Sequence, residues 1–326
     1  MKACALGSMM LAAVLFAAVD ADASCGSSSC PIDLQSLLDL SRSSLDLSFQ
    51  YIDQNQPRIG TRKAHVGEIA SEHDEIRTIN RLTNLQFQFA VSPRFQLALT
   101  APLVSRVHEH RDTESQEIER WNFRGFGDAV VQARTRLFIS EASPHPSLWL
   151  TTGVKLPTGA RHEASNNSED AEVTIVPGTG STDLLLGLTW QSGVLRNTAL
   201  GGPMGHSTLI PWFVTASVRA NGRGTNEYRR GHELQLNTGT EYPLSSRLHL
   251  LGQLNARMLA KDDPGHTLED RDLTGGRFIY ASPGIRALLG HGASAYAFVQ
   301  IPLYQHVNEL QLTSKVNYVI GFRRQF

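Results

Sequence analysis

The chain has 326 residues, of which 41% are apolar, and its 30 Lys and Arg residues nearly balance its 31 Asp and Glu residues. A chain this close to neutral gives no electrostatic argument for nucleic acid, so no nucleic-acid partner is expected. Beyond the N-terminus, no stretch approaches the ~18 apolar residues that a membrane-spanning helix requires. These features exclude a helical membrane protein, and any membrane integration must use strands.

Residues 1–23 are predicted to form a secretory signal peptide. Lys2 precedes the apolar run 11–19, and Ala21 and Ala23 mark a small-residue cleavage site. The apolar run is too short to cross a bilayer as a helix. Export then places the rest of the chain in an oxidising compartment.

Residues 24–43 are predicted to be a periplasmic N-terminal segment that carries Cys25 and Cys30. In an oxidising compartment, a disulfide between these two cysteines is favoured over free thiols. A lipid anchor on Cys25 is an alternative, but residues 22–24 lack the apolar residue that a lipidation signal requires. A metal or redox role for the pair has weaker support.

Residues 44–326 show the period-two alternation of strands with one apolar and one polar face. In 45–51, Leu45, Leu47 and Phe49 alternate with Asp46 and Ser48. The side chains of this polar phase are too polar to be buried in the core of a β-sandwich without hydrogen-bond partners. The pattern fits a barrel wall between lipid and a water-filled lumen. About twelve segments have this character, an even number that is typical of single-chain barrels. They are 45–51, 85–89, 95–99, 129–137, 148–156, 184–190, 209–218, 234–238, 248–258, 277–288, 295–303 and 316–326.

The connections alternate in length. Short links are expected at 92–94, 140–146, 243–246 and 290–292, with 191–207 as a longer exception. Long polar links are expected at 53–74, 108–126, 159–180, 221–231 and 261–276. Long extracellular loops and short periplasmic turns are the outer-membrane arrangement. The predicted fold is therefore an all-β, transmembrane, antiparallel up-and-down β-barrel of about 12 strands with long extracellular loops. A secreted soluble β protein is the alternative.

The closing strand, 316–326, places Tyr318, Ile320 and Phe322 on one face and ends in an aromatic residue, Phe326. Such a strand is expected to engage the barrel-assembly machinery of a Gram-negative cell. Arg324 departs from the usual C-terminal signal, in which the third residue from the end is aromatic.

Seven polar residues fall on the predicted inner phase of their strands. These candidate lumen-lining residues are Gln86, Gln88, Gln96, Gln132, Arg134, Arg136 and Lys155. The cations among them, joined by Arg219 and Arg257, would favour anions or set a transverse field. Alternatively they form internal ion pairs with Asp46, Asp183 and Glu241, which is the favoured outcome in a narrow barrel.

A cluster of histidines and carboxylates is predicted at the extracellular rim. If the turn after 85–89 centres near residue 93, Thr78 faces His108 and Ile76 faces His110. His73 and Asp74 then come close to both histidines. His73, Asp74, His108 and His110 have the ligand types for zinc, copper or another divalent ion. A solvated, charged loop is the favoured alternative, and no other cofactor is expected.

Five short motifs resemble those of the outer-membrane barrels named for the meta-pathway of phenol degradation. They are Gly125-Phe-Gly127-Asp128, Lys155-Leu-Pro157-Thr-Gly159, Gly178-Thr-Gly180-Ser-Thr-Asp183, Ile301-Pro-Leu-Tyr304-Gln and the final residues 321–326. The resemblance spans residues 44–326 and implies a transporter or channel for small, often aromatic or apolar solutes. Read without the resemblance, the Gly and Pro residues mark where strands begin and end.

The leading functional prediction is a passive outer-membrane channel or transporter, not an enzyme, with membrane lipid and small solutes as its partners. One alternative is a binding or structural protein with the rim metal site. An outer-membrane hydrolase is less favoured, because His249 on the wall has no Gly-x-Ser-x-Gly motif or paired serine to accompany it.

Overall fold

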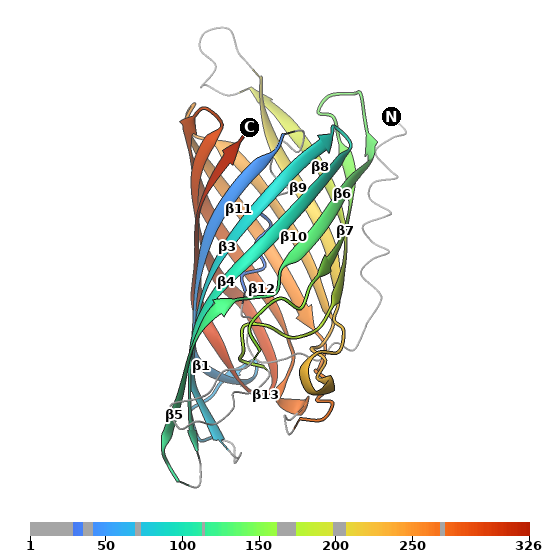
Figure 1. Cartoon of the computed structure of the whole chain (residues 1–326). Coiled ribbons are helices and arrows are strands. Elements are labelled where there is room, and N and C mark those ends of the chain that lie inside the picture. The colour runs from blue at the N-terminus through green and yellow to red at the C-terminus, as the bar shows by residue number, and fades with distance from the viewer. Residues whose placement is uncertain are drawn as a thin grey trace, which may run out of the picture.

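The computed structural model describes residues 29–34, 42–68, 73–112, 115–161, 174–197, 207–267 and 271–326. The predicted signal peptide, residues 1–23, lies outside the described residues, as does Cys25. The described chain forms a closed antiparallel β-barrel (Figure 1). Within these ranges, no helix has the length and apolar character needed to cross a membrane.

Eleven of the thirteen strands in the described chain form the barrel wall. The wall strands are β1 (Ser44–Gly60), β3 (His73–Ser92), β4 (Phe95–Asp112), β6 (Val130–Ile139), β7 (Ser147–Lys155), β8 (Asp183–Asn197), β9 (Ser207–Ala220), β10 (Glu233–Pro243), β11 (Leu248–Leu259), β12 (Gly276–Gly290) and β13 (Ala293–Gln325). The short strand β2 (Arg62–Lys63) pairs with β1, and β5 (Ile118–Phe126) pairs with β4. Two turns of 3-10 helix, η3 (Thr225–Glu227) and η4 (Arg271–Leu273), lie in long connections.

The last strand, β13, reverses direction near Glu309, whose φ is +35°. Its first limb, 293–307, pairs with β12, and its second limb, 310–325, pairs antiparallel with β1. Asn317 on the second limb donates a 3.0 Å hydrogen bond to Gln300 on the first. When the two limbs of β13 are counted separately, the eleven described wall strands form a barrel of twelve strand segments. The predicted strand number is confirmed, and the pairing of the second limb with β1 closes the barrel.

The wall is apolar outside and polar inside. Leu85 and Phe87 of β3 expose 47% and 45% of their surface, whereas Gln88 exposes 2%. Gln88 donates a 2.6 Å hydrogen bond to the fully buried Gln96 of β4. Apolar side chains that remain exposed on a closed wall face lipid, and the paired amides face the lumen.

The connections follow the predicted alternation between the two rims. Short turns at Pro93, at 140–146 and at His291 lie at one rim, together with the C-terminus (Figure 1). At the other rim β3, β4 and β5 extend beyond the remaining strands (Figure 1). By the rule for outer-membrane barrels, this extended rim is extracellular.

Two long connections contain more strand than the sequence predicts. In place of the loop expected at 53–74, β1 continues to Gly60 and β3 begins at His73. In place of the loop expected at 108–126, β5 covers Ile118–Phe126 and pairs with the outer half of β4. In β5 the apolar residues Trp121 and Phe123 face inward and Arg120 and Arg124 face outward, so the apolar-outside, polar-inside alternation used to predict wall strands does not hold there.

Candidate solute site inside the barrel

Part of the predicted N-terminal segment, residues 29–34, lies inside the barrel. Residues 29–34, here called the plug segment, bind four wall strands through hydrogen bonds. The Cys30 amide donates to Gln50 (2.9 Å), and the Asp33 amide donates to Gln253 (3.0 Å). Gln253 returns a hydrogen bond to the Asp33 carbonyl (2.8 Å), and Thr215 donates to the Asp33 carboxylate (2.9 Å). The wall therefore satisfies the main chain of the plug segment much as a neighbouring strand would.

Two arginines add hydrogen bonds at the ends of the plug segment. Arg257 donates to the Ser29 carbonyl (3.2 Å), and Arg323 donates to the Leu34 carbonyl (3.0 Å). Cys30 packs in a buried cluster, and Ile32 and Leu34 pack against that cluster. The wall residues of the cluster are Ile52, Leu251, Tyr296, Phe298 and Val319. Apolar burial and hydrogen bonding together hold the segment in the lumen.

Residues 174–182 turn inward from the long connection between β7 and β8, and are here called the inward loop. Ile175 and Val176 form a buried apolar cluster with Trp121 and Phe123 of β5. Arg106 donates to the Ile175 carbonyl, and Arg230 to the Thr174 carbonyl at 2.9 Å. The inward loop therefore lies across the lumen on the extracellular side.

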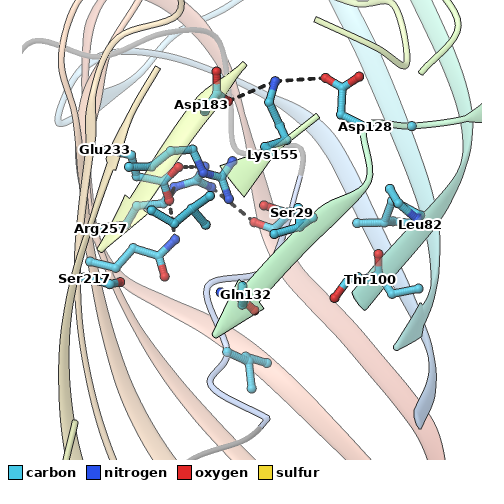
Figure 2. Close-up of a pocket in the computed structure, with 18 of the residues that line it drawn as sticks. Ser29, Leu82, Thr100, Asp128, Gln132, Lys155, Asp183, Ser217, Glu233 and Arg257 are labelled. Carbon is cyan, nitrogen blue, oxygen red and sulfur yellow. Dashed lines mark hydrogen bonds and ion pairs between the residues drawn. The ribbon is translucent and has the colours of Figure 1, made fainter. Parts of the chain in front are cut away.

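A buried ionic cluster fastens the inward loop to the wall. Lys155, the last residue of β7, lies 2.9 Å from Asp128 and 2.9 Å from Asp183 through its Nζ atom. Figure 2 shows both carboxylates directed at the lysine. Thr179 donates from its amide (2.9 Å) and its hydroxyl (2.7 Å) to Asp128. We call Asp128, Lys155 and Asp183 the latch, because they join β7, β8 and the residues before β6 to the inward loop.

Two glycines, Gly159 and Gly178, allow the two backbone segments at the latch to approach each other closely. A Cβ atom on Gly159 would lie 2.7 Å from the Gly178 Cα, and one on Gly178 would lie 2.5 Å from the Gly159 carbonyl carbon. The amide of Gly159 also donates to Asp128 (3.0 Å). These glycines therefore serve a backbone requirement, as their residue type indicates. Three of the sequence motifs, those containing Asp128, Lys155 and Asp183, meet at this point.

The pKa of Asp128 is set by opposing effects. Burial raises the pKa of this carboxyl, but Lys155 and the hydrogen bonds from Thr179 outweigh burial. The net result is a pKa below the ordinary aspartate value. Asp128 is therefore ionised throughout the physiological range, and the latch carries one cation between two carboxylate side chains.

A cavity of about 490 Å³ lies between the plug segment and the inward loop. Ile32 and Leu34 line it on the plug side, and Val176 and Thr179 on the loop side. Its wall mixes apolar residues, amides and hydroxyls with charged side chains, and several of the charged ones pair with each other, such as Arg257 with Glu233 (Figure 2). Lining residues from the wall include Leu82, Thr100, Val104, Gln132, Leu185 and Ser217. A site of this size and mixed character suits a small molecule.

The predicted lumen-lining residues lie on the inner phase of their strands, and four of them line the cavity. Those four are Gln86, Gln132, Arg134 and Lys155. Gln88 and Gln96 bond to each other nearer the short-turn rim, and Gln86 donates to Thr100 (3.0 Å). Arg136 lies over the Trp149 ring, 5.5 Å from its centroid, and Arg134 lies 5.9 Å from the same centroid. A role for these residues in solute passage stays a prediction.

Many inward charges form ion pairs, with partners that the sequence indicates only in part. Lys155 pairs with Asp183 as expected, but Asp46 pairs with Arg323 (2.9 Å). Arg257 pairs with Glu233 (2.9 Å). Glu241 accepts hydrogen bonds from both Arg286 and His249. His249, the candidate for a hydrolase, therefore belongs to an ionic cluster of the wall.

The rim histidines lie side by side, with a register that differs from expectation at one position. Thr78 faces His108 as predicted, and its hydroxyl lies 2.8 Å from the ring. His110 faces Glu75 and not Ile76, because a bulge between Glu75 and Arg77 shifts β3 by one residue. An irregularity of this kind leaves no signal in an alternation pattern.

The side chains around the rim histidines are engaged with each other. His110 lies 2.5 Å from Glu119, His108 lies 3.8 Å from Glu75, and Asp74 lies 3.4 Å from Arg111. In the described chain, no group of three or more His, Cys, Asp or Glu side chains is arranged to hold a metal ion. The His73 side chain lies outside the described residues. A divalent ion at this rim stays a prediction, which metal analysis of an H108A/H110A variant would test.

Cys30 is buried in the plug segment and has no disulfide partner among the described residues. Burial raises its pKa to about 12, although Arg257 acts in the opposite direction. Its predicted disulfide partner, Cys25, is outside the described residues, so the pairing stays a prediction. A signal for the plug segment does exist in the sequence, since the apolar residues Cys30, Ile32 and Leu34 recur at every second position.

No protein-family model matches the chain, and no curated protein matches it. Among solved structures, the COG4313 outer membrane channel from Pseudomonas putida F1 aligns with 91% of this chain and 100% of its own, at a TM-score of 0.60 and 12% identity. The Ralstonia pickettii toluene transporter TbuX aligns with 93% of this chain and 95% of its own, at a TM-score of 0.45 and 8% identity. The likeness to the first structure shows the fold. This chain has the fold of an outer-membrane β-barrel.

Proposed function

We propose that the protein is an outer-membrane channel or transporter for the passive movement of small solutes, with the cavity between the plug segment and the inward loop as part of its path. The observation that carries the proposal is the pair of closures. Neither closure belongs to the wall, and each is held by side chains that the wall supplies. A barrel built only for stability has no need of a cavity bounded in this way.

The residues that line the cavity favour one class of solute. Leu82, Val104 and Leu185 offer apolar surface, and Thr100 and Gln132 offer hydrogen bonds to one polar group. A small molecule with an apolar body and a single polar group, such as a phenol, fits this chemistry. The sequence resemblance to phenol-pathway barrels, which implies aromatic or apolar solutes, agrees with it.

Uptake into liposomes tests the proposal. The purified full chain is reconstituted, and the entry rates of phenol, benzoate and a neutral disaccharide are compared with those into protein-free liposomes. We expect protein-dependent uptake of phenol, slower uptake of benzoate and little uptake of the disaccharide. Equal rates with and without protein for all three solutes, in wild type and in a variant with an opened latch, would contradict a transport function.

A further inference from the structure

The outward face of the sheet formed by β3, β4 and β5 carries two arginines that have no acidic partner among the described residues. Arg81 of β3 lies directly beside Ser105 of β4, and Ser105 lies beside Arg124 of β5. Their side chains point outward, because the alternate residues Asn80 and Val104 are buried on the inner phase. The three residues therefore form one row across the outer surface of the sheet.

This row lies at the boundary of the apolar belt. The adjoining row toward the membrane contains Leu103 and Phe126, which expose 46% and 64% of their surface. The Arg81 row continues through Tyr51 of β1 to Tyr318 of β13. Aromatic residues at this level are typical of the interface between lipid chains and headgroups. The arginines are thus level with the headgroups of the outer leaflet.

The next row outward has a different charge balance. That row contains the uncharged residues Ile79 and Val107. One row further out the arginines have carboxylate partners: Arg77 binds Asp53 through two hydrogen bonds of 2.9 and 2.7 Å, and Arg120 lies 3.3 Å from Glu109. In the described part of the chain, no carboxylate pairs with Arg81 or Arg124. Two unneutralised guanidinium groups are therefore confined to the row that borders the lipid.

We propose that Arg81, Ser105 and Arg124 bind a phosphate group of a lipopolysaccharide molecule in the outer leaflet. The two arginines stand two strand spacings apart, ~10 Å, on either side of the serine hydroxyl. Guanidinium groups bind phosphate through paired hydrogen bonds, and a hydroxyl adds a third donor between them. The acyl chains of the same molecule lie along the exposed apolar wall below, which includes Leu85 and Leu103.

Binding of purified lipopolysaccharide to the detergent-solubilised full chain tests the proposal. The R81A/R124A variant is expected to bind about 30-fold more weakly, the loss that corresponds to ~1 kcal/mol for each basic residue at an anionic lipid surface. The matched control is R94A/R247A, which removes two exposed arginines from the short turns of the opposite rim. Its affinity is expected to equal that of the wild type.

Three further arms fix the identity of the ligand. Dephosphorylated lipopolysaccharide is expected to bind the wild type as weakly as native lipopolysaccharide binds R81A/R124A. Inorganic phosphate and phosphatidylglycerol vesicles are expected to compete poorly, because neither combines the phosphate with the multiple acyl chains that the wall accommodates. The charge-conserving R81K/R124K variant is expected to keep intermediate affinity, and it provides a measurement if the alanine variant does not fold.

The proposal is overturned by equal affinities of wild type and R81A/R124A, or by undiminished binding of dephosphorylated lipopolysaccharide. Competition by phosphatidylglycerol at equal concentration would also overturn it in favour of a general anionic-lipid surface. An R81K/R124K variant that binds no better than the alanine variant, with its fold intact by heat-modifiable gel migration, would contradict it as well.

Discussion

The plug segment and the inward loop close opposite sides of one cavity by different chemistry. The plug segment is held by the hydrogen bonds described above, most of them between its main chain and neutral or basic side chains of the wall. The inward loop depends on the latch, in which one lysine lies between two buried carboxylates. Loss of one hydrogen bond leaves the other hydrogen bonds in place. Removal of the central lysine, in contrast, leaves both carboxylates of the latch buried without a cation.

The plug segment and the inward loop are therefore expected to respond to different substitutions. Each hydrogen bond of the plug segment contributes about 0.5–1.5 kcal/mol. Removal of one partner from a buried ion pair costs about 3–5 kcal/mol, because the remaining charges stay buried without compensation. The inward loop is therefore the closure that a single substitution releases.

The largest effect is expected for Lys155→Met. Asp128 and Asp183 are then left buried without their cation, and the inward loop should leave the lumen to hydrate them. Single-channel conductance in planar bilayers should rise well above that of the wild type. The control is Lys261→Met, which removes a lysine at the same 2.9 Å distance from Asp272, a carboxylate that is 65% exposed. Unchanged conductance in Lys155→Met would contradict the role of the latch.

A smaller effect is expected for Gly178→Ala. The added Cβ would meet the Gly159 carbonyl carbon at 2.5 Å, so the backbones at the latch must separate, at a cost of about 1–3 kcal/mol. Conductance should rise, but less than in Lys155→Met. The matched control is Gly252→Ala, since nothing lies within 4 Å of a Cβ at that wall position. A rise in both alanine variants would argue against a specific effect at the latch.

For the plug segment, the sharpest change is Gln253→Ala. It removes two hydrogen bonds to Asp33 and should loosen the segment by about 1–2 kcal/mol. The readout, in a Cys25→Ser background that leaves Cys30 as a free thiol, is the rate at which a maleimide labels Cys30, whose pKa of about 12 reflects burial in the closed state. Labelling should accelerate in Gln253→Ala. It should not do so in Gln88→Ala, where the lost amide binds Gln96 in the wall.

The smallest effect is expected from moderate acid. Because the folded-state pKa of Asp128 is lowered, its stabilising contribution is present above the ordinary aspartate value of about 3.9 and is lost as pH falls through the lowered value. Conductance should therefore be constant between about pH 7 and 5 and rise only in stronger acid. A rise that begins near pH 6 would show that another group controls the closure.

The sequence predicts the wall well because the membrane imposes a strict pattern on it. The alternation of apolar and polar residues identified all twelve strand segments of the wall, including the limb of β13 that ends at Gln325, since each segment has lipid on one side and the lumen on the other. Above the apolar belt that constraint disappears. For this reason β5 and the extensions of β1 and β3 were expected to be loops.

The interior is predicted less completely, because its contacts join residues that are far apart in the chain. The inner phase of Arg134 and Lys155 follows from alternation, but the pairing of Asp46 with Arg323 depends on register across the closing seam. The latch residues fall in motifs that the sequence singles out, yet only the fold brings Asp128, Lys155 and Asp183 together. Entry of the plug segment into the lumen depends on apolar contacts with five wall residues, which no local pattern specifies.

The central claim, that the two closures control a solute path, is tested most directly by phenol uptake into liposomes containing the Lys155→Met/Gln253→Ala variant. With both closures weakened, uptake should exceed that of the wild type and of either single variant, while heat-modifiable gel migration shows an intact barrel. An intact double variant that admits phenol no faster than protein-free liposomes would contradict the account.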